Sequence, residues 1–227
     1  MIRRRTECTA NTPRCRTAQN YQAQTRACCR RHIRDLLAGV QELFAAHDIT
    51  WWADYGTLLG AVRHGGLIPH DKDADIGILA EDFERLLALD VHTNPWHDTS
   101  RGRPNRTRPM AGFIWNHKPP RQPDEADGAE FTAGDSIKVW LSAKNQTNVD
   151  IFPWHRRDDG TFYRTRYVNV DRFKGREFNE DRLFPLGTIA YEDLTIPAPA
   201  DPEWFCEHRY GPEWRTPIAA NNDRVPR

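Results

Sequence analysis

The sequence lacks the features that mark an exported or membrane-spanning protein. No apolar run approaches the roughly 20 residues that a bilayer-spanning helix needs. The start, MIRRRTECTANTPRC, is positively charged, but no apolar segment follows it as it would in a secretory signal. We therefore expect a cytoplasmic protein with no transmembrane segment.

Neither sign of charge is in excess, and lysine is rare. The formal net charge is +0, and only five of the 32 basic residues are lysines. This balance gives no sign of a nucleic-acid partner, and we expect none. The chain has 227 residues, of which 38% are hydrophobic and 28% charged, so it is long enough for one large globular domain or two small ones.

Hydrophobic periodicity predicts alternating helices and strands. We predict helices at about residues 26–46, 57–62, 81–89 and 201–210. We predict strands at residues 49–52, 74–79, 136–141 and 148–152. Residues 93–135 are polar and rich in proline, so we predict a long loop there, which in a compact domain is functional or disordered.

Three acids stand at every second position before a buried strand. Asp71, Asp73 and Asp75 run directly into the apolar segment Ile76 to Leu79. Alternate residues of a strand point to the same face, so Asp73 and Asp75 project together, about 7 Å apart at the backbone. Like charges at such a place are unfavourable unless they are paired or bind a metal. An isolated Asp-x-Asp is more often a solvated turn, but the flanking apolar pattern favours chelation of a divalent cation by carboxylate oxygens.

A third acid and a short helix complete the predicted site. Asp150 is the lone acid inside the apolar segment VDIF, so we expect it on a neighbouring strand. Upstream, the region of Gly56, Thr57 and Gly60 would bring a helix N-terminus and its backbone N–H groups near the metal, where a phosphate can bind. Together these features describe the active site of a nucleotidyltransferase fold. We therefore predict an α/β (α+β) protein with a mixed sheet and helices packed against it.

The acidic segment resembles the signature of the LicD and fukutin family. The match runs from Gly56 to Gly77, through GTLLGAVRHGGLIPHDKDADIG, and VDIFPW at Val149–Trp154 looks like the later motif of the family. The resemblance covers about residues 30–217 and is closest to the fukutin-related members. It implies a catalytic nucleotidyltransferase-fold domain at residues 31–227, preceded by a Cys-rich arm at residues 1–30. His70 and Lys72 depart from the family pattern.

The resemblance implies a metal-dependent phosphotransferase. Family members move a phosphorylated alcohol, such as phosphocholine or ribitol phosphate, from a CDP-alcohol to a hydroxyl group and release CMP. The acceptor is a glycan, a lipid-linked molecule or a small molecule. Two alternatives share the same acids: a true nucleotidyltransferase, which releases pyrophosphate, and an inactive module that binds nucleotide or metal.

The resemblance also assigns roles to residues. Asp73, Asp75 and Asp150 would hold Mg²⁺ or Mn²⁺, and Asp71 would support them or take the acceptor proton. Gly56 and Thr57 would line the phosphates. Each of three further residues of the signature has two interpretations: Arg63, His64 and Lys72. Arg63 and His64 either contact the substrate or have a structural role at a helix end. Lys72 either weakens metal binding or contacts a phosphate.

Four cysteines gather near the start of the chain. They are Cys8, Cys15, Cys28 and Cys29. Four thiolates suit a tetrahedral structural zinc site, although the spacing lacks the usual pair of C-x2-C motifs. The fukutin-related members have a similar arrangement and use it for zinc, so the resemblance implies a Zn²⁺ site. Free thiols on a loose arm, or disulfides in an exported protein, are the alternatives. Cys206, in the predicted C-terminal helix, is expected to be an ordinary buried thiol.

Overall fold

The computed structural model describes most of the chain. It describes residues 8–9, 11–12, 24–89, 96–97, 106–110, 113–118, 136–142, 144–145, 147–164 and 177–217. The helices are α1 (Ala27–Ala46), α2 (Tyr55–His64), α3 (Ala80–Ala88), α4 (Glu180–Leu183) and α5 (Pro202–Tyr210). The strands are β1 (Trp51–Ala53), β2 (Asp73–Leu79), β3 (Trp96–His97), β4 (Arg106–Met110), β5 (Phe113–Lys118), β6 (Ser136–Trp140), β7 (Asn148–Arg156), β8 (Thr161–Tyr163), β9 (Phe178–Asn179), β10 (Gly187–Tyr191) and β11 (Leu194–Ala198).

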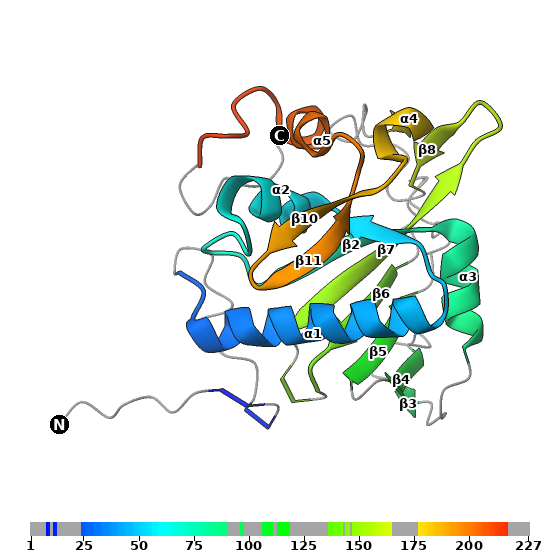
Figure 1. Cartoon of the computed structure of the whole chain (residues 1–227). Coiled ribbons are helices and arrows are strands. Elements are labelled where there is room, and N and C mark those ends of the chain that lie inside the picture. Colours follow the sequence, from blue (N-terminus) through cyan, green and yellow to red (C-terminus); the bar gives the residue numbers. More distant parts are fainter. Residues whose placement is uncertain are drawn as a thin grey trace, which may run out of the picture.

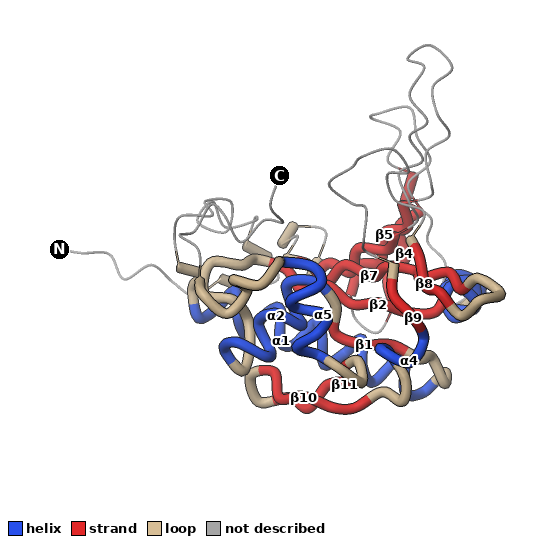
Figure 2. The backbone as a smooth tube through the Cα atoms, turned by 90° about the horizontal axis from the view of Figure 1, so that it is seen from above, coloured by secondary structure: helices blue, strands red, loops and turns tan. Residues whose placement is uncertain are grey.

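The main sheet is mixed. Its strands follow the order β1-β2-β7-β6-β5-β4-β3 (Figure 1). Strand β8 pairs with the end of β7, and β9 pairs with β8. The central pair, β2 and β7, is parallel, and the other pairs of this order are antiparallel. Strands β10 and β11 form a separate hairpin that contacts β1, α1 and α2 (Figure 2). The predicted α/β (α+β) class with a mixed sheet and packed helices is confirmed.

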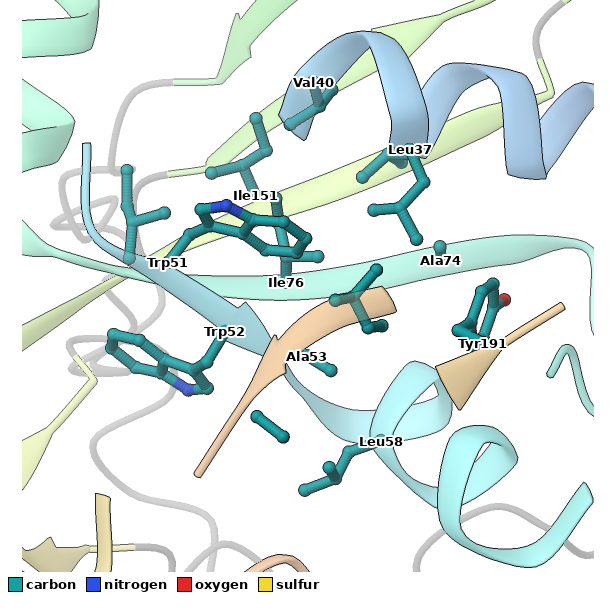
Figure 3. Close-up of a cluster of buried hydrophobic side chains, with 14 of the residues drawn as sticks. Leu37, Val40, Trp51, Trp52, Ala53, Leu58, Ala74, Ile76, Ile151 and Tyr191 are labelled. Atoms are coloured by element: carbon teal, nitrogen blue, oxygen red, sulfur yellow. The ribbon is translucent and has the colours of Figure 1, made fainter. Parts of the chain in front are cut away.

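One face of the central strands forms the core. Helix α1 lies across it, and Leu37 and Val40 of this helix lie over Ile76 of β2 and Ile151 of β7 (Figure 3). The periodicity of α1 explains this packing, because its apolar positions recur every three or four residues and form one buried stripe. Since side chains alternate along a strand, the residues between those of the core point to the opposite face. That opposite face carries the predicted acids.

The prediction of a loop across residues 93–135 is wrong for part of that segment. Strands β4 and β5 lie within it, and β5 pairs with β6 in the register Trp115 to Val139. Trp115 is buried and packs against Phe44 of α1, with ring centroids 6.5 Å apart. Because of Pro109 and the polar residues around it, this segment does not show the alternating apolar pattern from which a strand is predicted. Their pairing depends on β6, which is distant in the sequence.

The described helices are not membrane spans. None of them combines the length and the hydropathy that are needed to cross a bilayer.

Candidate active site

The predicted acids Asp73, Asp75 and Asp150 project from the same face of the central strands, opposite α1. In the parallel pair of β2 and β7, Asp75 stands directly opposite Asp150, and Asp73 stands opposite Asn148. Neighbouring strands are about 4.8 Å apart, so carboxylates at paired positions are near neighbours. On the other side of β7, Lys138 of β6 stands opposite Asp150. A row of Asp75, Asp150 and Lys138 therefore crosses three adjacent strands.

Helix α2 begins beside this row because of Asp54. The backbone N–H of Asp54 donates to the Asp75 carbonyl oxygen at 3.1 Å, which extends the pairing of β1 with β2. The Asp54 carboxylate then accepts the Tyr55 N–H at 2.8 Å and caps the helix. Tyr55 has a positive φ of 41°, an uncommon backbone conformation for a residue other than glycine. The chain thus turns sharply from strand to helix next to Asp75.

Gly56 and Thr57 bring the start of α2 into contact with the acids. A Cβ atom on Gly56 would lie 2.8 Å from Asp71 Oδ2 and 3.5 Å from Asp75 Oδ2, so a larger residue here would require the Asp71 carboxylate to move. The Thr57 hydroxyl is buried and accepts the Asp75 N–H at 2.7 Å. The partial positive charge of a helix N-terminus therefore lies beside the carboxylates. An anion held at this terminus would lie near the same acids.

The pKa of Asp75 is perturbed by its surroundings. Burial, followed by the charges of Asp73 and Asp150, raises the pKa of Asp75 well above its ordinary value. Burial and nearby acids likewise raise the pKa of Tyr191 and of Tyr210 well above the usual tyrosine range, with Asp75 among the charges that act on both. The site therefore holds more negative charge than its surroundings compensate, which is the condition that favours a bound cation.

Two residues that the sequence analysis did not single out hold Asp150. The Lys138 ammonium lies 2.6 Å from Asp150 Oδ1 and also contacts Oδ2, and Asn148 Nδ2 donates to Oδ1 at 3.0 Å. The signal for Lys138 was present in the sequence, because it stands between Ile137 and Val139 in an alternating strand. Its charge points to the same face as Asp150 for that reason.

Asp71 lies in the loop that enters β2. Its Oδ1 accepts the Lys72 N–H at 2.9 Å, and its Oδ2 lies against Gly56. The segment before α1 holds this loop in place: the Thr25 N–H donates to the Pro69 oxygen at 2.6 Å, and the Thr25 hydroxyl donates to the Asp71 carbonyl oxygen. Asp71 and Asp75 thus both face Gly56 at the start of α2.

Arg63 and His64 are not brought to the acids. Both lie in the last turn of α2, and Arg63 is seven residues beyond Gly56, which is about 10 Å along a helix. Arg63 Nη1 donates to the Trp214 carbonyl oxygen at 3.0 Å. His64 is exposed at the helix end. Both residues therefore lie at the opposite end of α2 from Gly56.

Three of the four N-terminal cysteines are buried together. Cys8, Cys28 and Cys29 form a small cluster, and Cys15 lies outside the described residues. Burial acts to raise the pKa of Cys28, but hydrogen bonds from Cys8 and Cys29 outweigh it and lower the pKa. The described cysteines form no disulfide.

The metal ligands predicted above are present but not gathered around one point. Within the part of the chain that the structure describes, no three His, Cys, Asp or Glu side chains are arranged to hold a metal ion. The donor set at Asp73, Asp75 and Asp150 nevertheless fits a hard divalent cation, because carboxylate oxygens are the ligands that Mg²⁺ and Mn²⁺ prefer. In this conformation Asp150 is turned to Lys138 instead.

The geometry can be compared with known proteins at this point. A family model described as LicD/FKTN/FKRP, nucleotidyltransferase domain, matches residues 48–201, which include all four acids of the site. The chain belongs to the LicD family. Human ribitol 5-phosphate transferase FKRP is 29% identical to it over 188 residues, which are 83% of this chain and 33% of that protein.

Two further proteins are similar to this chain. Mouse ribitol-5-phosphate transferase FKTN is 25% identical over 197 residues, which cover 83% of this chain and 34% of that protein. An uncharacterised protein of Rickettsia typhi is 27% identical over 187 residues, covering 80% and 46%. The chain thus spans about a third of the length of FKRP and FKTN. Among solved structures, lincomycin-bound lincosamide antibiotic adenylyltransferase LnuA gives a TM-score of 0.37 at 14% identity, over 73% of this chain and 79% of that one.

Proposed function

We propose that the protein is a divalent-metal-dependent transferase that moves a phosphorylated alcohol from a CDP-alcohol to a hydroxyl group and releases CMP. The observation that carries this proposal is the pairing of Asp75 with Asp150 in the register of β2 and β7, next to the N-terminus of α2. This arrangement puts carboxylates for a cation and N–H groups for a phosphate side by side. Membership of the LicD family supports the same reaction class.

Asp73, Asp75 and Asp150 would hold Mg²⁺ or Mn²⁺. When bound, such an ion neutralises phosphoryl oxygens and keeps the attacking and leaving oxygens in line. Burial, and then the negative charges of Asp73 and Asp150, raise the pKa of Asp75, and a cation bound there would offset both effects, which supports this assignment.

The other residues of the site would bind the donor and manage the proton. The start of α2 at Gly56 and Thr57 would receive the diphosphate, and Lys72 lies on the same loop as Asp71, where it could contact a phosphate. The acceptor oxygen forms a bond to the phosphorus that carries the alcohol, and the bond from this phosphorus to the CMP oxygen breaks. CMP leaves with the electron pair, and Asp71 is our candidate for the base that takes the acceptor proton.

Among the donors, we favour CDP-ribitol over CDP-choline. Both animal relatives are named ribitol 5-phosphate transferases, and the cysteine arrangement of this chain also resembles the fukutin-related members. The acceptor would be a hydroxyl of a glycan, a lipid-linked molecule or a small molecule.

The deciding experiment measures thermal stability of the protein with Mn²⁺ and each member of a donor panel: CDP-ribitol, CDP-choline, CDP-glycerol, CTP and ATP. A ligand at a hundred times its dissociation constant should add about 2.7 kcal/mol of stability. Stabilisation by one CDP-alcohol, lost in Asp75→Asn, supports the proposal and names the donor. Stabilisation by a nucleoside triphosphate alone, with release of pyrophosphate, indicates a nucleotidyltransferase. No response to metal or nucleotide would contradict the proposal and both alternatives.

We also propose that the N-terminal arm binds a structural Zn²⁺ through Cys8, Cys15, Cys28 and Cys29. The burial of Cys8, Cys28 and Cys29 in one cluster and the lowered pKa of Cys28 support this, because zinc binds the thiolate form. Elemental analysis should find one zinc per chain, lost in Cys28→Ser and kept in Cys206→Ser. Equal zinc content in both variants and the wild type would contradict the site.

A further inference from the structure

Lys138 stands out among the residues that surround the acids. It lies on β6, an interior strand of the sheet, and its side chain is 25% exposed, while that of Asp150 is 13% exposed. The ammonium contacts both oxygens of the Asp150 carboxylate. The exposed pairs Arg157–Glu177 and Arg34–Asp193 also make two contacts, but the side chains of Lys138 and Asp150 are less exposed than theirs.

The partner of Lys138 is a carboxylate that the proposed chemistry needs. Asp150 stands between Asp75 on β2 and Lys138 on β6, in one row across the sheet. A cation at Asp75 and Asp150 would bring its double charge within a few ångströms of the ammonium. The two positive charges would repel each other at that distance. Because the ammonium contacts both oxygens of Asp150, a cation that takes this carboxylate would compete with Lys138 for it.

The lysine side chain is suited to displacement. Its ammonium is a compact, hydrated charge on a flexible stem of four carbons, unlike the rigid fork of arginine. Lys138 points to the same face as the acids and the start of α2, as does Trp140 two residues later on β6. An ammonium that leaves Asp150 therefore remains on the face where we expect the phosphates of the donor, and lysine binds phosphate as a point charge.

We propose that Lys138 is a positioning residue with two partners. Without metal it is the counter-ion that holds the Asp150 carboxylate, and when a divalent cation takes that carboxylate, the ammonium moves to a phosphate of the donor. This inference rests on the proposed function, since it needs a cation at Asp75 and Asp150. It adds a residue that makes metal binding and donor binding depend on each other.

The test measures binding rather than turnover. Lys138→Met keeps the apolar stem and removes the charge, and Lys138→Gln keeps a hydrogen-bond donor for Asp150 if the first variant folds poorly. Lys144→Met is the matched control, because Lys144 is exposed in the turn between β6 and β7. Titration calorimetry with Mn²⁺ alone comes first, followed by CDP at saturating Mn²⁺.

We expect removal of the competing ammonium to tighten Mn²⁺ binding about tenfold and to weaken CDP binding about tenfold, with Lys144→Met unchanged in both. A tenfold change corresponds to about 1.4 kcal/mol. Wild-type affinity for Mn²⁺ in both Lys138 variants would overturn the displacement, and wild-type affinity for CDP would overturn the phosphate contact.

A second pair of measurements separates this inference from the proposed function. If Asp75→Asn abolishes Mn²⁺ binding but the Lys138 variants bind Mn²⁺ as the wild type does, the proposed function stands and the role of Lys138 is wrong. If neither the wild type nor the Lys138 variants bind Mn²⁺, the metal site itself is wrong and the inference falls with it. If the Lys138 variants bind Mn²⁺ and the wild type does not, Lys138 prevents Mn²⁺ binding in the wild type, which supports the competition.

Discussion

At the scale of single residues, the site is a balance of charges that folding alone does not require. At Asp75, burial and then the charges of Asp73 and Asp150 disfavour the ionised carboxylate and raise its pKa, whereas Asp150 has a cation of its own in Lys138. The two paired acids thus differ in how much of their charge is compensated. Such uncompensated charge lowers stability and is common at functional sites.

Asp75→Asn should therefore remove function and raise stability. The amide keeps the shape of the side chain but removes the opposed charge, so the metal-free variant should melt at a higher temperature than the wild type. Mn²⁺ should no longer stabilise it, and transfer should fall about 100-fold or more. Asp158→Asn, in an exposed turn, removes the same charge elsewhere and should change neither property.

The effect of Asp75 on stability also has a predicted dependence on pH. Because its pKa is raised in the folded state, the unfolded chain loses this proton first, starting near pH 4. Metal-free wild type should therefore lose stability relative to Asp75→Asn as the pH rises from about 4 through the elevated pKa. Urea denaturation of both proteins at several pH values measures the difference in their free energies of unfolding. A difference that does not change with pH would contradict the prediction.

Cys206 is a titratable group that its environment keeps in the protonated, unreactive thiol form. It is buried in α5, and burial raises its pKa to about 12. We expect iodoacetamide at pH 8 to leave Cys206 unmodified in the folded protein and to modify it in urea, as mass spectrometry of the peptide can show. Rapid modification of the native protein would mean that α5 opens locally.

At the scale of elements, α2 determines how close the backbone comes to the acids. Its first turn meets Asp71 and Asp75 at Gly56, and its middle meets the following loop at Gly60. At Gly60 a Cβ atom would overlap the backbone oxygen of Gly66, and it would lie 3.2 Å from the Ile68 nitrogen. Gly56 therefore lets the helix approach the acids, and Gly60 lets it pack against the backbone of the following loop.

Alanine at the two positions should separate activity from stability. In Gly56→Ala the new Cβ meets only the movable carboxylate of Asp71, and alanine favours a helix, so stability should change by less than about 1 kcal/mol. Transfer should fall about tenfold or more, because Asp71 must move. In Gly60→Ala the clash is with backbone, so we expect a loss of about 1–3 kcal/mol. Urea denaturation and a CMP-release assay measure both, and full activity of Gly56→Ala would argue against a role for Asp71.

At the scale of the whole molecule, a buried ion pair joins distant parts of the chain. Arg209 of α5 pairs with Asp54 at 2.8 Å, and both side chains are almost fully buried. Asp54 also accepts the Trp154 indole N–H at 2.9 Å, and Arg209 lies over the rings of Tyr55 and Trp154. The C-terminal helix thereby fixes the residue that starts α2 beside the acids.

Arg209→Met should therefore be strongly destabilising. It leaves the Asp54 carboxylate buried without its cation, for which the typical cost is about 3–5 kcal/mol. Arg182→Met is the matched control, since Arg182 pairs with Asp201 where both side chains are 43% exposed, and we expect a loss below about 1 kcal/mol. Urea denaturation compares the two. Equal losses would mean that the buried pair is not what links α5 to α2.

The sequence determined the parts of this protein that depend on local spacing. Helix α1 follows from the apolar stripe of residues 33–44, and the shared face of Asp73 and Asp75 follows from the period of a strand. The lone acid in VDIF was correctly expected on a strand next to β2, because a carboxylate inside an apolar strand needs a partner or a cation. These features depend on residues that are close to one another in the sequence.

Only the tertiary structure decided which strands meet and in what register. The register of β2 with β7 sets Asp75 opposite Asp150, and that of β6 with β7 sets Lys138 against the same carboxylate. Strands β4 and β5 form within a segment that local pattern assigns to a loop, because their pairing with β6 outweighs a weak propensity. Residues far apart in the chain make these contacts, and no local period encodes their pairing.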